Sequence, residues 1–278
     1  MIPKLGGRFA AWAMVLLTLA LSKAGVAQLV LYDNFNSQQI DPSKWDGSFP
    51  FQDPNSLEAV RELSATAGQD NDRRLHLKET TYSATTDDNG GSGSIFGLGF
   101  LVPIDITEAS FSVVVKDAKT VACGSNPSSP VDIGPEFRGR FFNTESSPTS
   151  QLGDVEGGIG AYRTPGDVGS AIQVEFHYER CDDEFCSTRT PLDFGVLGYI
   201  QPGTTNRFHI KWDQPHHRFI FQLNNGPLVF SPYPVSDSSP PSFAFRAIDI
   251  AQQVAHCTTT PRPFASIDAY FDNVRVNP

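Results

Sequence analysis

The chain has 278 residues, with 21 basic and 31 acidic side chains, and a formal net charge of −10 at neutral pH. An acidic chain of this kind repels nucleic acid and anionic membrane surfaces, which excludes a protein that binds polyanions through a basic surface. Its length suffices for one large core and fits a single all-β domain. Acidity is compatible with binding cations or neutral and basic glycans, and the need for solubility also accounts for it.

The first 27 residues have the pattern of a secretory signal peptide. Lys4 and Arg8 make a basic start, residues 10–21 form an apolar run, and small residues precede a cleavage point after Ala27. An uncleaved membrane anchor is the alternative, but the run is shorter than the roughly 20 apolar residues that a span needs. We therefore expect a secreted protein, extracellular or periplasmic, in which residues 28–278 form one domain.

All four cysteines lie in the part of the chain that is expected to be exported. An even number of cysteines in an oxidising compartment predicts two disulfides, and four cysteines allow three pairings. We favour Cys181–Cys186, which closes a short turn, together with Cys123–Cys257, in which each cysteine ends a strand-like run. A zinc site is the alternative, but no second close pair of cysteines completes its ligand set.

Most segments have the pattern of a strand followed by a loop that contains Pro, Gly or Ser. The runs expected as strands are residues 28–35, 59–63, 75–81, 94–102, 110–116, 137–143, 157–163, 171–180, 194–200, 208–213, 218–223, 242–256 and 265–276. Residues 57–65 are the only stretch that could instead form a short helix. About a dozen strands separated by turns predict an all-β fold with two antiparallel sheets packed as a sandwich.

The clearest alternation lies in residues 171–180. Its apolar side chains are Ile172, Val174, Phe176 and Tyr178, and its polar side chains are Gln173, Glu175, His177 and Glu179. A period of two predicts a strand with one buried and one exposed face. Residues 208–213 and 218–223 alternate in the same way and predict a hairpin, and Asn225-Gly226 supplies the tight turn that follows. Trp212 lies on the apolar face of that hairpin and is expected in the core.

Both ends of the chain and this hairpin resemble the concanavalin A-like lectin and glucanase superfamily. Residues 31–35 (Leu-Tyr-Asp-Asn-Phe) and 40–45 (Ile-Asp-Pro-Ser-Lys-Trp) resemble its opening, and residues 267–276 resemble its last strand. The hairpin is similar to that of its laminin-G-like and laminarinase-type members. The resemblance implies a jelly-roll sandwich with one concave polar sheet, in which Trp45 is a structural residue. Members include lectins, glycan-binding modules, glycosidases and structural domains, so the fold does not settle the activity.

The resemblance implies one candidate catalytic motif. In laminarinase-type members the concave sheet carries Glu-x-Asp-x-Glu, with the first glutamate as nucleophile and the last as acid and base. The match here is Glu175-x-His177-x-Glu179, with histidine in place of aspartate. A retaining mechanism needs carboxyl groups about 5–5.5 Å apart, whereas residues i and i+4 of a flat strand are roughly 13 Å apart at Cα. A charged histidine would also lower the pKa of both glutamates, which opposes an acid that must hold its proton.

The alternative for these three residues is a solvated strand face whose glutamates pair with Arg138, Arg140 or Arg163 on neighbouring strands. A groove that binds a glycan without hydrolysis needs aromatic and hydrogen-bonding side chains instead of a tuned acid. The candidates for this role, besides His177, are Arg138, Arg140, Tyr162, Gln173 and Tyr199.

We therefore expect a protein that recognises extracellular or cell-wall polysaccharide, without catalysis. A retaining hydrolase of β-glucan that uses Glu175 and Glu179 is the alternative, and an interaction domain of the cell envelope is a further one. The resemblance also implies a structural calcium ion held by Asp33 and Asp272, and no other cofactor. Calcium takes six to eight oxygen ligands, and the alternative is that Asp272 hydrogen-bonds a neighbouring strand.

Overall fold

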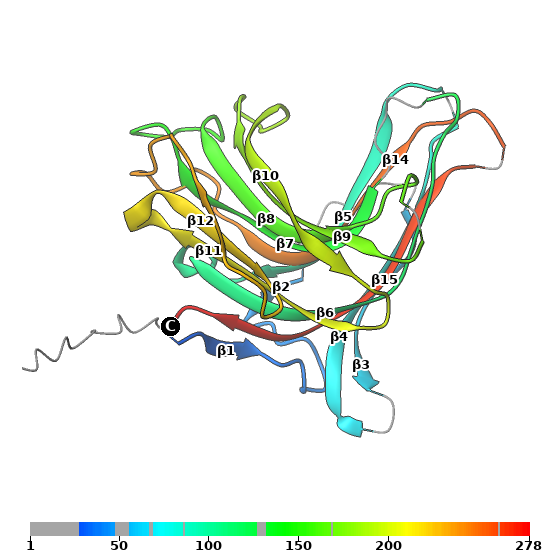
Figure 1. Ribbon diagram of the computed structural model, residues 1–278, viewed down its shortest axis with the longest axis horizontal. Helices are drawn as coiled ribbons and strands as arrows, with labels where there is room; N and C mark the ends of the chain where they lie inside the picture. The colour runs from blue at the N-terminus through cyan, green and yellow to red at the C-terminus, as the bar shows by residue number, and fades with distance from the viewer. Residues whose placement is uncertain are drawn as a thin grey trace, which may run out of the picture.

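The computed structural model describes residues 28–47, 56–66, 69–85, 87–126, 132–167, 169–260 and 262–278. The expected signal peptide at residues 1–27 lies outside them. Within the described residues, two sheets of antiparallel strands pack face to face, as Figure 1 shows. Among those residues, no helix has the length and the apolar composition that crossing a membrane requires.

Eight strands form the first sheet, which we call the back sheet. They are β1 (Val30–Asp33), β3 (Ser56–Thr66), β4 (Gln69–Tyr82), β6 (Glu108–Val121), β11 (Thr205–Asp213), β12 (Arg218–Leu223), β13 (Val229–Pro232) and β15 (Phe264–Val276). Their order is β13-β12-β11-β6-β15-β4-β3, and β1 pairs with the end of β15. The predicted hairpin is confirmed as β11 and β12, joined through the short 3-10 helix η2 (Gln214–His216).

Seven strands form the second sheet, which we call the front sheet. They are β2 (Trp45–Asp46), β5 (Gly91–Phe100), β7 (Asp132–Asn143), β8 (Asp154–Tyr162), β9 (Ile172–Cys181), β10 (Arg189–Ile200) and β14 (Arg246–Ala255). Their order is β10-β9-β8-β7-β14-β5-β2. In Figure 1, β9 and β10 rise on one side and β5 and β14 on the other, so the front sheet is curved. A second 3-10 helix, η1 (Pro103–Asp105), connects β5 to β6.

The alternating apolar side chains of the sequence fill the space between the sheets. Ile172, Val174, Phe176 and Tyr178 of β9 are all buried, as predicted. Phe176 stacks on Phe221 of β12 with 4.4 Å between ring centroids, which joins the two sheets directly. Burial of each large apolar side chain contributes about 1.5–3 kcal/mol, so this interior is the main source of stability. The predicted two-sheet antiparallel sandwich is confirmed.

Two tryptophans support this interior, as expected. Trp45 is buried, and its Nε1 donates a hydrogen bond to Asp33 Oδ2 at 2.7 Å. Trp212 packs against the core while its Nε1 donates to the hydroxyl of Tyr233 at 2.8 Å. Each indole therefore buries its ring and still satisfies its polar N–H group.

The possible helix at residues 57–65 is wrong. These residues lie in β3, where Arg61 is opposite Leu77 of β4 and Leu63 is opposite Leu75. Pairing with β4 satisfies the backbone groups of the segment, and this tertiary contact outweighs its local helix preference.

Both favoured disulfides are present. Cys123–Cys257 joins the segment after β6 to the segment after β14, so it connects the back sheet to the front sheet. Cys181–Cys186 closes the loop between β9 and β10. Since all four cysteines are paired in this way, the zinc alternative is excluded.

Candidate functional site

The concave face of the front sheet carries a cleft of about 700 Å³, which we call the main cleft. Its side chains come from β5 and β14 on one side, from β7 and β8 in the middle, and from β9 and β10 on the other. On β9 every second residue from Glu175 to Glu179 lines the cleft, because side chains of a strand alternate between its two faces.

Strand register brings acidic groups from three strands into one row across the main cleft. Glu175 of β9 is opposite Gly160 of β8, Gly160 is opposite Glu136 of β7, and Glu136 is opposite Asp249 of β14. A Cβ atom at Gly160 would lie 2.6 Å from the hydroxyl of Tyr162. Glycine is therefore required at this position, because it leaves room for the tyrosine between the carboxylates.

A second row runs beside the first. His177 of β9 is opposite Phe194 of β10 on one side and Gly158 of β8 on the other, and Gly158 is opposite Arg138 of β7. A Cβ atom at Gly158 would lie 3.1 Å from His177 Cε1. The two glycines of β8 thus keep the floor of the cleft low between β7 and β9.

Arg138 pairs with three buried carboxyl groups at the bottom of the main cleft, those of Glu136, Glu156 and Asp249. We call these four residues the floor. Arg138 Nε lies 3.2 Å from Glu136 Oε1 and 3.2 Å from Asp249 Oδ2, and its Nη1 lies 3.6 Å from Glu156 Oε1. Burial opposes the charge of Arg138, but the carboxylates of Asp249, Glu136 and Glu156 outweigh it and raise the pKa of the guanidinium. Burial of Glu156 is likewise outweighed, first by Arg138, and its pKa is lowered.

Asp249 behaves differently from its neighbours. It is fully buried, and this burial raises its pKa well above the usual range of a carboxyl group in spite of Arg138. The charged side chains of the floor therefore form ion pairs with one another.

Tyr162 and Asp132 lie at one end of the main cleft. The hydroxyl of Tyr162 donates a hydrogen bond to Glu136 Oε2. Burial raises the pKa of Tyr162, and the charge of Glu136 raises it further, so the phenol stays protonated. Burial, followed by repulsion from Glu136 and Glu175, raises the pKa of Asp132 to about 6. This end of the cleft therefore carries an acid that takes up a proton just below neutral pH.

The three residues of the candidate catalytic motif all line the main cleft. Glu175 Oε1 accepts a hydrogen bond from Gln173 Nε2, and Glu179 Oε1 accepts one from Nη1 of Arg189. Arg189 of β10 is a partner that the sequence reasoning did not consider. Its guanidinium engages one of the two carboxylate oxygens of Glu179, the residue expected to act as the acid.

The predicted binding residues divide into three groups. Arg138 and Tyr162 line the main cleft. Gln173 and Tyr199 lie at its edge, where the Tyr199 hydroxyl donates to Gln173 Oε1 at 2.9 Å and the tyrosine is 65% exposed. Arg140 is buried one row further along β7, where its Nε lies 3.4 Å from Glu156 Oε2.

The cleft residues that the sequence reasoning missed include Asp132, Glu136, Arg189 and Phe194. The strand expected at residues 137–143 begins at 132 in the structure, so the first two fell in a presumed loop. Phe194 is 73% exposed and points to the cleft from β10. The expected strand at residues 194–200 has apolar residues on both faces, so no local pattern marked Phe194 as exposed.

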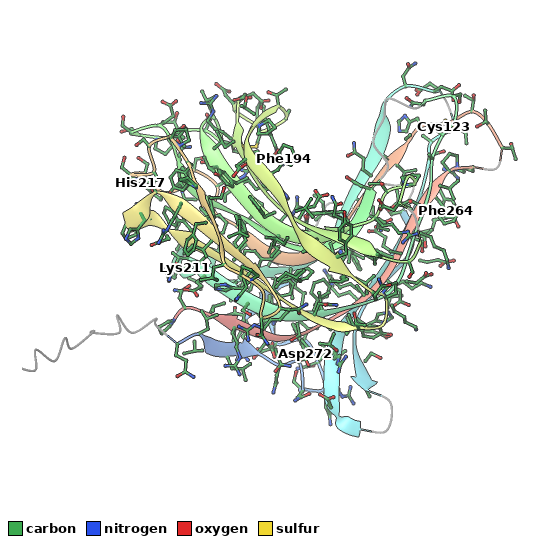
Figure 2. All side chains as sticks on the ribbon, in the orientation of Figure 1. Cys123, Phe194, Lys211, His217, Phe264 and Asp272 are labelled. Carbon is green, nitrogen blue, oxygen red and sulfur yellow. A yellow bond between two sulfur atoms is a disulfide. The ribbon has the colours of Figure 1, made fainter. Side chains whose placement is uncertain are left out.

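The side chains expected to hold calcium lie in the back sheet, on the opposite side of the molecule from Phe194 (Figure 2). Both carboxylate oxygens of Asp33 accept hydrogen bonds, Oδ1 from the N–H of Phe35 at 2.8 Å and Oδ2 from Trp45. Asp272 accepts from the backbone and side chain of Asn273. These oxygens are occupied by N–H donors, so the donor set does not fit a calcium shell, and the calcium expectation rests on the resemblance alone.

No family model matches the chain, and no curated protein matches it. Several solved structures are similar to the chain over most of its length. One is LamAcat from Zobellia galactanivorans, with 13% identity, a TM-score of 0.43, and coverage of 90% of this chain and 98% of that chain. Another is kappa-carrageenase from Pseudoalteromonas carrageenovora, with 8% identity, a TM-score of 0.39, and coverage of 93% and 99%.

A third is lectin II from Ulex europaeus, with 13% identity, a TM-score of 0.30, and coverage of 86% of this chain and 98% of that chain. The three TM-scores are all below 0.5, so these similarities carry no argument about the chain.

Proposed function

We propose that the main cleft binds a polysaccharide outside the cell and does not hydrolyse it. The observation that carries this proposal is that exposed aromatic rings and hydrogen-bonding side chains lie next to one another along the main cleft. Phe194 and Tyr199 expose aromatic rings along β10, and Glu175, His177 and Gln173 stand beside them on β9. A sugar ring offers C–H groups that pack on an aromatic face and hydroxyl groups that hydrogen-bond carboxylates, imidazole and amides.

The alternative is hydrolysis of a β-glucan through Glu175 and Glu179, which both line the main cleft. The hydrogen bond from Arg189 to Glu179 argues against it, because one oxygen of the carboxylate expected to act as the acid is already engaged by a guanidinium. The enzyme hypothesis predicts that Glu175→Gln and Glu179→Gln each abolish the release of reducing ends from β-glucan. Our proposal predicts no release from the wild-type protein.

The binding test is a panel of insoluble and soluble polysaccharides that includes β-glucans, with pull-down followed by titration calorimetry. We expect Phe194→Ala and Tyr199→Ala each to weaken binding about fivefold, since one aromatic contact contributes roughly 1 kcal/mol. Phe230→Ala is the matched control, because Phe230 is 50% exposed but lies on β13 of the back sheet. Absence of binding to every polysaccharide of the panel would refute the proposal.

We also propose that the protein is secreted. The pattern of residues 1–27 and the two disulfides support this, because disulfides persist in oxidising compartments. Expression of the full chain should yield a processed protein whose first residue is Gln28, as N-terminal sequencing would show. An unprocessed chain inside the cell would contradict it.

A further inference from the structure

A second hollow of about 390 Å³ lies on loops beyond the main cleft, and we call it the loop hollow. Its wall is formed by Gln151 from the loop between β7 and β8, by Glu184 and Phe185 from the loop between β9 and β10, and by Ser242 and Phe243 from the segment before β14. The two hairpin loops touch, since the backbone N–H of Gln151 donates to the carbonyl of Glu184 at 3.2 Å. Figure 1 shows these loops at the upper left, above the ends of their strands.

Phe185 is an exposed ring on a rigid loop. It is 78% exposed, and the disulfide Cys181–Cys186 closes the loop that carries it. The carboxylate of Asp183 accepts hydrogen bonds from the backbone N–H groups of Phe185 at 2.9 Å and of Ser187 at 3.0 Å. The loop that carries the ring is already constrained, so it loses little conformational freedom when the ring contacts a ligand. Phe185 is therefore well suited to be a binding contact.

Phe243 is a second exposed ring, fixed by a different residue. It is 54% exposed. The carboxylate of Asp154, which is fully buried, accepts hydrogen bonds from the backbone N–H groups of Ser242 at 2.8 Å and of Phe243 at 3.3 Å. The guanidinium of Arg140 lies 5.5 Å from the centre of the Phe243 ring. The two aromatic rings of the loop hollow are therefore held by two independent sets of contacts.

A chain of polar contacts connects the loop hollow to the main cleft. Arg140 Nη1 donates to Gln151 Oε1 in the loop hollow at 2.6 Å, and Arg140 Nε lies 3.4 Å from Glu156 Oε2. The other oxygen of Glu156 lies 3.6 Å from Nη1 of Arg189, which lines the main cleft. Polar contacts through Arg140, Glu156 and Arg189 thus connect the two sites.

We propose that the loop hollow is a separate binding position for one neutral sugar unit of the same polysaccharide that occupies the main cleft. In this inference, which rests on the proposed function, the sugar packs against Phe185 and Phe243 and its hydroxyl groups bond to Gln151 and Ser242. Aromatic rings beside amide and hydroxyl groups suit the apolar faces and polar edges of a sugar ring. Glu184 at the same wall disfavours an acidic sugar.

A glycan that contacts Phe194 and also fills the loop hollow must extend to the loop between β9 and β10. Phe194 is opposite His177, which lies about 13 Å of extended strand from Cys181 at that loop. A disaccharide bound at Phe194 is too short to fill the loop hollow as well, whereas a hexasaccharide is long enough. The difference in affinity between a disaccharide and a hexasaccharide therefore measures the contribution of the loop hollow.

The test is calorimetric titration of the processed protein, with both disulfides intact, with a β-glucan disaccharide and a β-glucan hexasaccharide. Phe185→Ala and Phe243→Ala should each weaken hexasaccharide binding about fivefold and leave disaccharide binding unchanged, while Phe194→Ala should weaken both. Leu57→Ala is the control, because Leu57 is 53% exposed on the back sheet. Thermal melts of all variants should coincide with the wild type, since each of these side chains is exposed.

Wild-type hexasaccharide affinity in both Phe185→Ala and Phe243→Ala would overturn this inference and leave the proposed function standing. A wild-type protein that binds neither sugar would overturn this inference, and absence of binding to every polysaccharide of the panel would overturn the proposed function as well. If either loop variant loses disaccharide affinity as strongly as hexasaccharide affinity, the loop hollow is not a separate position and the inference is wrong.

Discussion

The floor and the β10 edge of the main cleft differ in what they leave available to a ligand. On the floor, Arg138 is bound by Glu136, Glu156 and Asp249, and all three carboxyl groups are buried. At the edge, Phe194 and Tyr199 expose most of their surface to solvent. Charged groups that already pair with one another gain little free energy from binding a ligand. Exposed aromatic rings gain free energy when a ligand removes them from water. We infer that the floor stabilises the fold and that the edge supplies most of the binding.

The largest effect should follow from breaking the floor. Arg138→Leu leaves three buried carboxyl groups without their common cation and should lower the free energy of unfolding by about 3–5 kcal/mol. Urea denaturation measures it. The control is Lys78→Ala, which removes an exposed ion pair with Glu58 at 3.4 Å and should change stability by less than about 1 kcal/mol. Equal stability of the two variants would show that the floor network does not hold the sheet.

The acid at the end of the cleft should give a smaller effect that depends on pH. Burial, with repulsion from Glu136 and Glu175, raises the pKa of Asp132 in the folded protein to about 6, whereas in the unfolded chain it is near 4. Folding therefore takes up a proton between these values. The stability that this proton provides is complete below about pH 4 and is lost as the pH rises through about 6.

Asp132→Asn removes this titration. Its free energy of unfolding at pH 7 should exceed that of the wild type by about 1–2 kcal/mol, with a flatter slope between pH 4 and 7. Denaturant unfolding at several pH values measures both quantities. A variant whose pH profile is parallel to that of the wild type would contradict the raised pKa.

The edge should behave in the opposite way to the floor. Phe194→Ala should leave the free energy of unfolding within about 0.5 kcal/mol of the wild type, because the ring is 73% exposed in the folded protein. Its effect should instead be on glycan affinity. A loss of stability comparable to that of Arg138→Leu would mean that the ring is a structural contact and would remove the distinction between edge and floor.

The smallest effect is expected for calcium. The oxygens of Asp33 and Asp272 accept hydrogen bonds from N–H groups, so millimolar calcium or a chelator should leave the melting temperature unchanged. Differential scanning calorimetry with each addition measures this. A rise in the melting temperature with calcium would restore the metal site that the resemblance implies.

Much of the scaffold was predictable from local patterns. The alternation of Ile172, Val174, Phe176 and Tyr178 fixes which face of β9 is buried. Both disulfides could be chosen, one because it closes a short turn and the other because its cysteines end strand-like runs. The segment at residues 57–65 could not be assigned in this way, because its strand conformation depends on pairing with β4. The local pattern of the segment does not show that pairing.

The cleft was predictable on β9 and less so elsewhere. Glu175, His177 and Glu179 were found because they alternate on one strand. Their partners come from other strands, and which side chain of β10 comes within reach of Glu179 depends on a register that no local pattern contains. Arg189 was therefore missed as its partner, and Asp132 was missed because the start of β7 was placed too late.

The most direct test of our central claim is glycan binding by a variant that changes only the edge of the cleft. We would measure the affinity of the Phe194→Ala/Tyr199→Ala double variant for the polysaccharide that the wild-type protein binds most tightly in the panel. We predict a loss of at least tenfold, with an unchanged melting temperature and with wild-type affinity for Phe230→Ala. Wild-type affinity in the double variant would contradict a glycan site on this face.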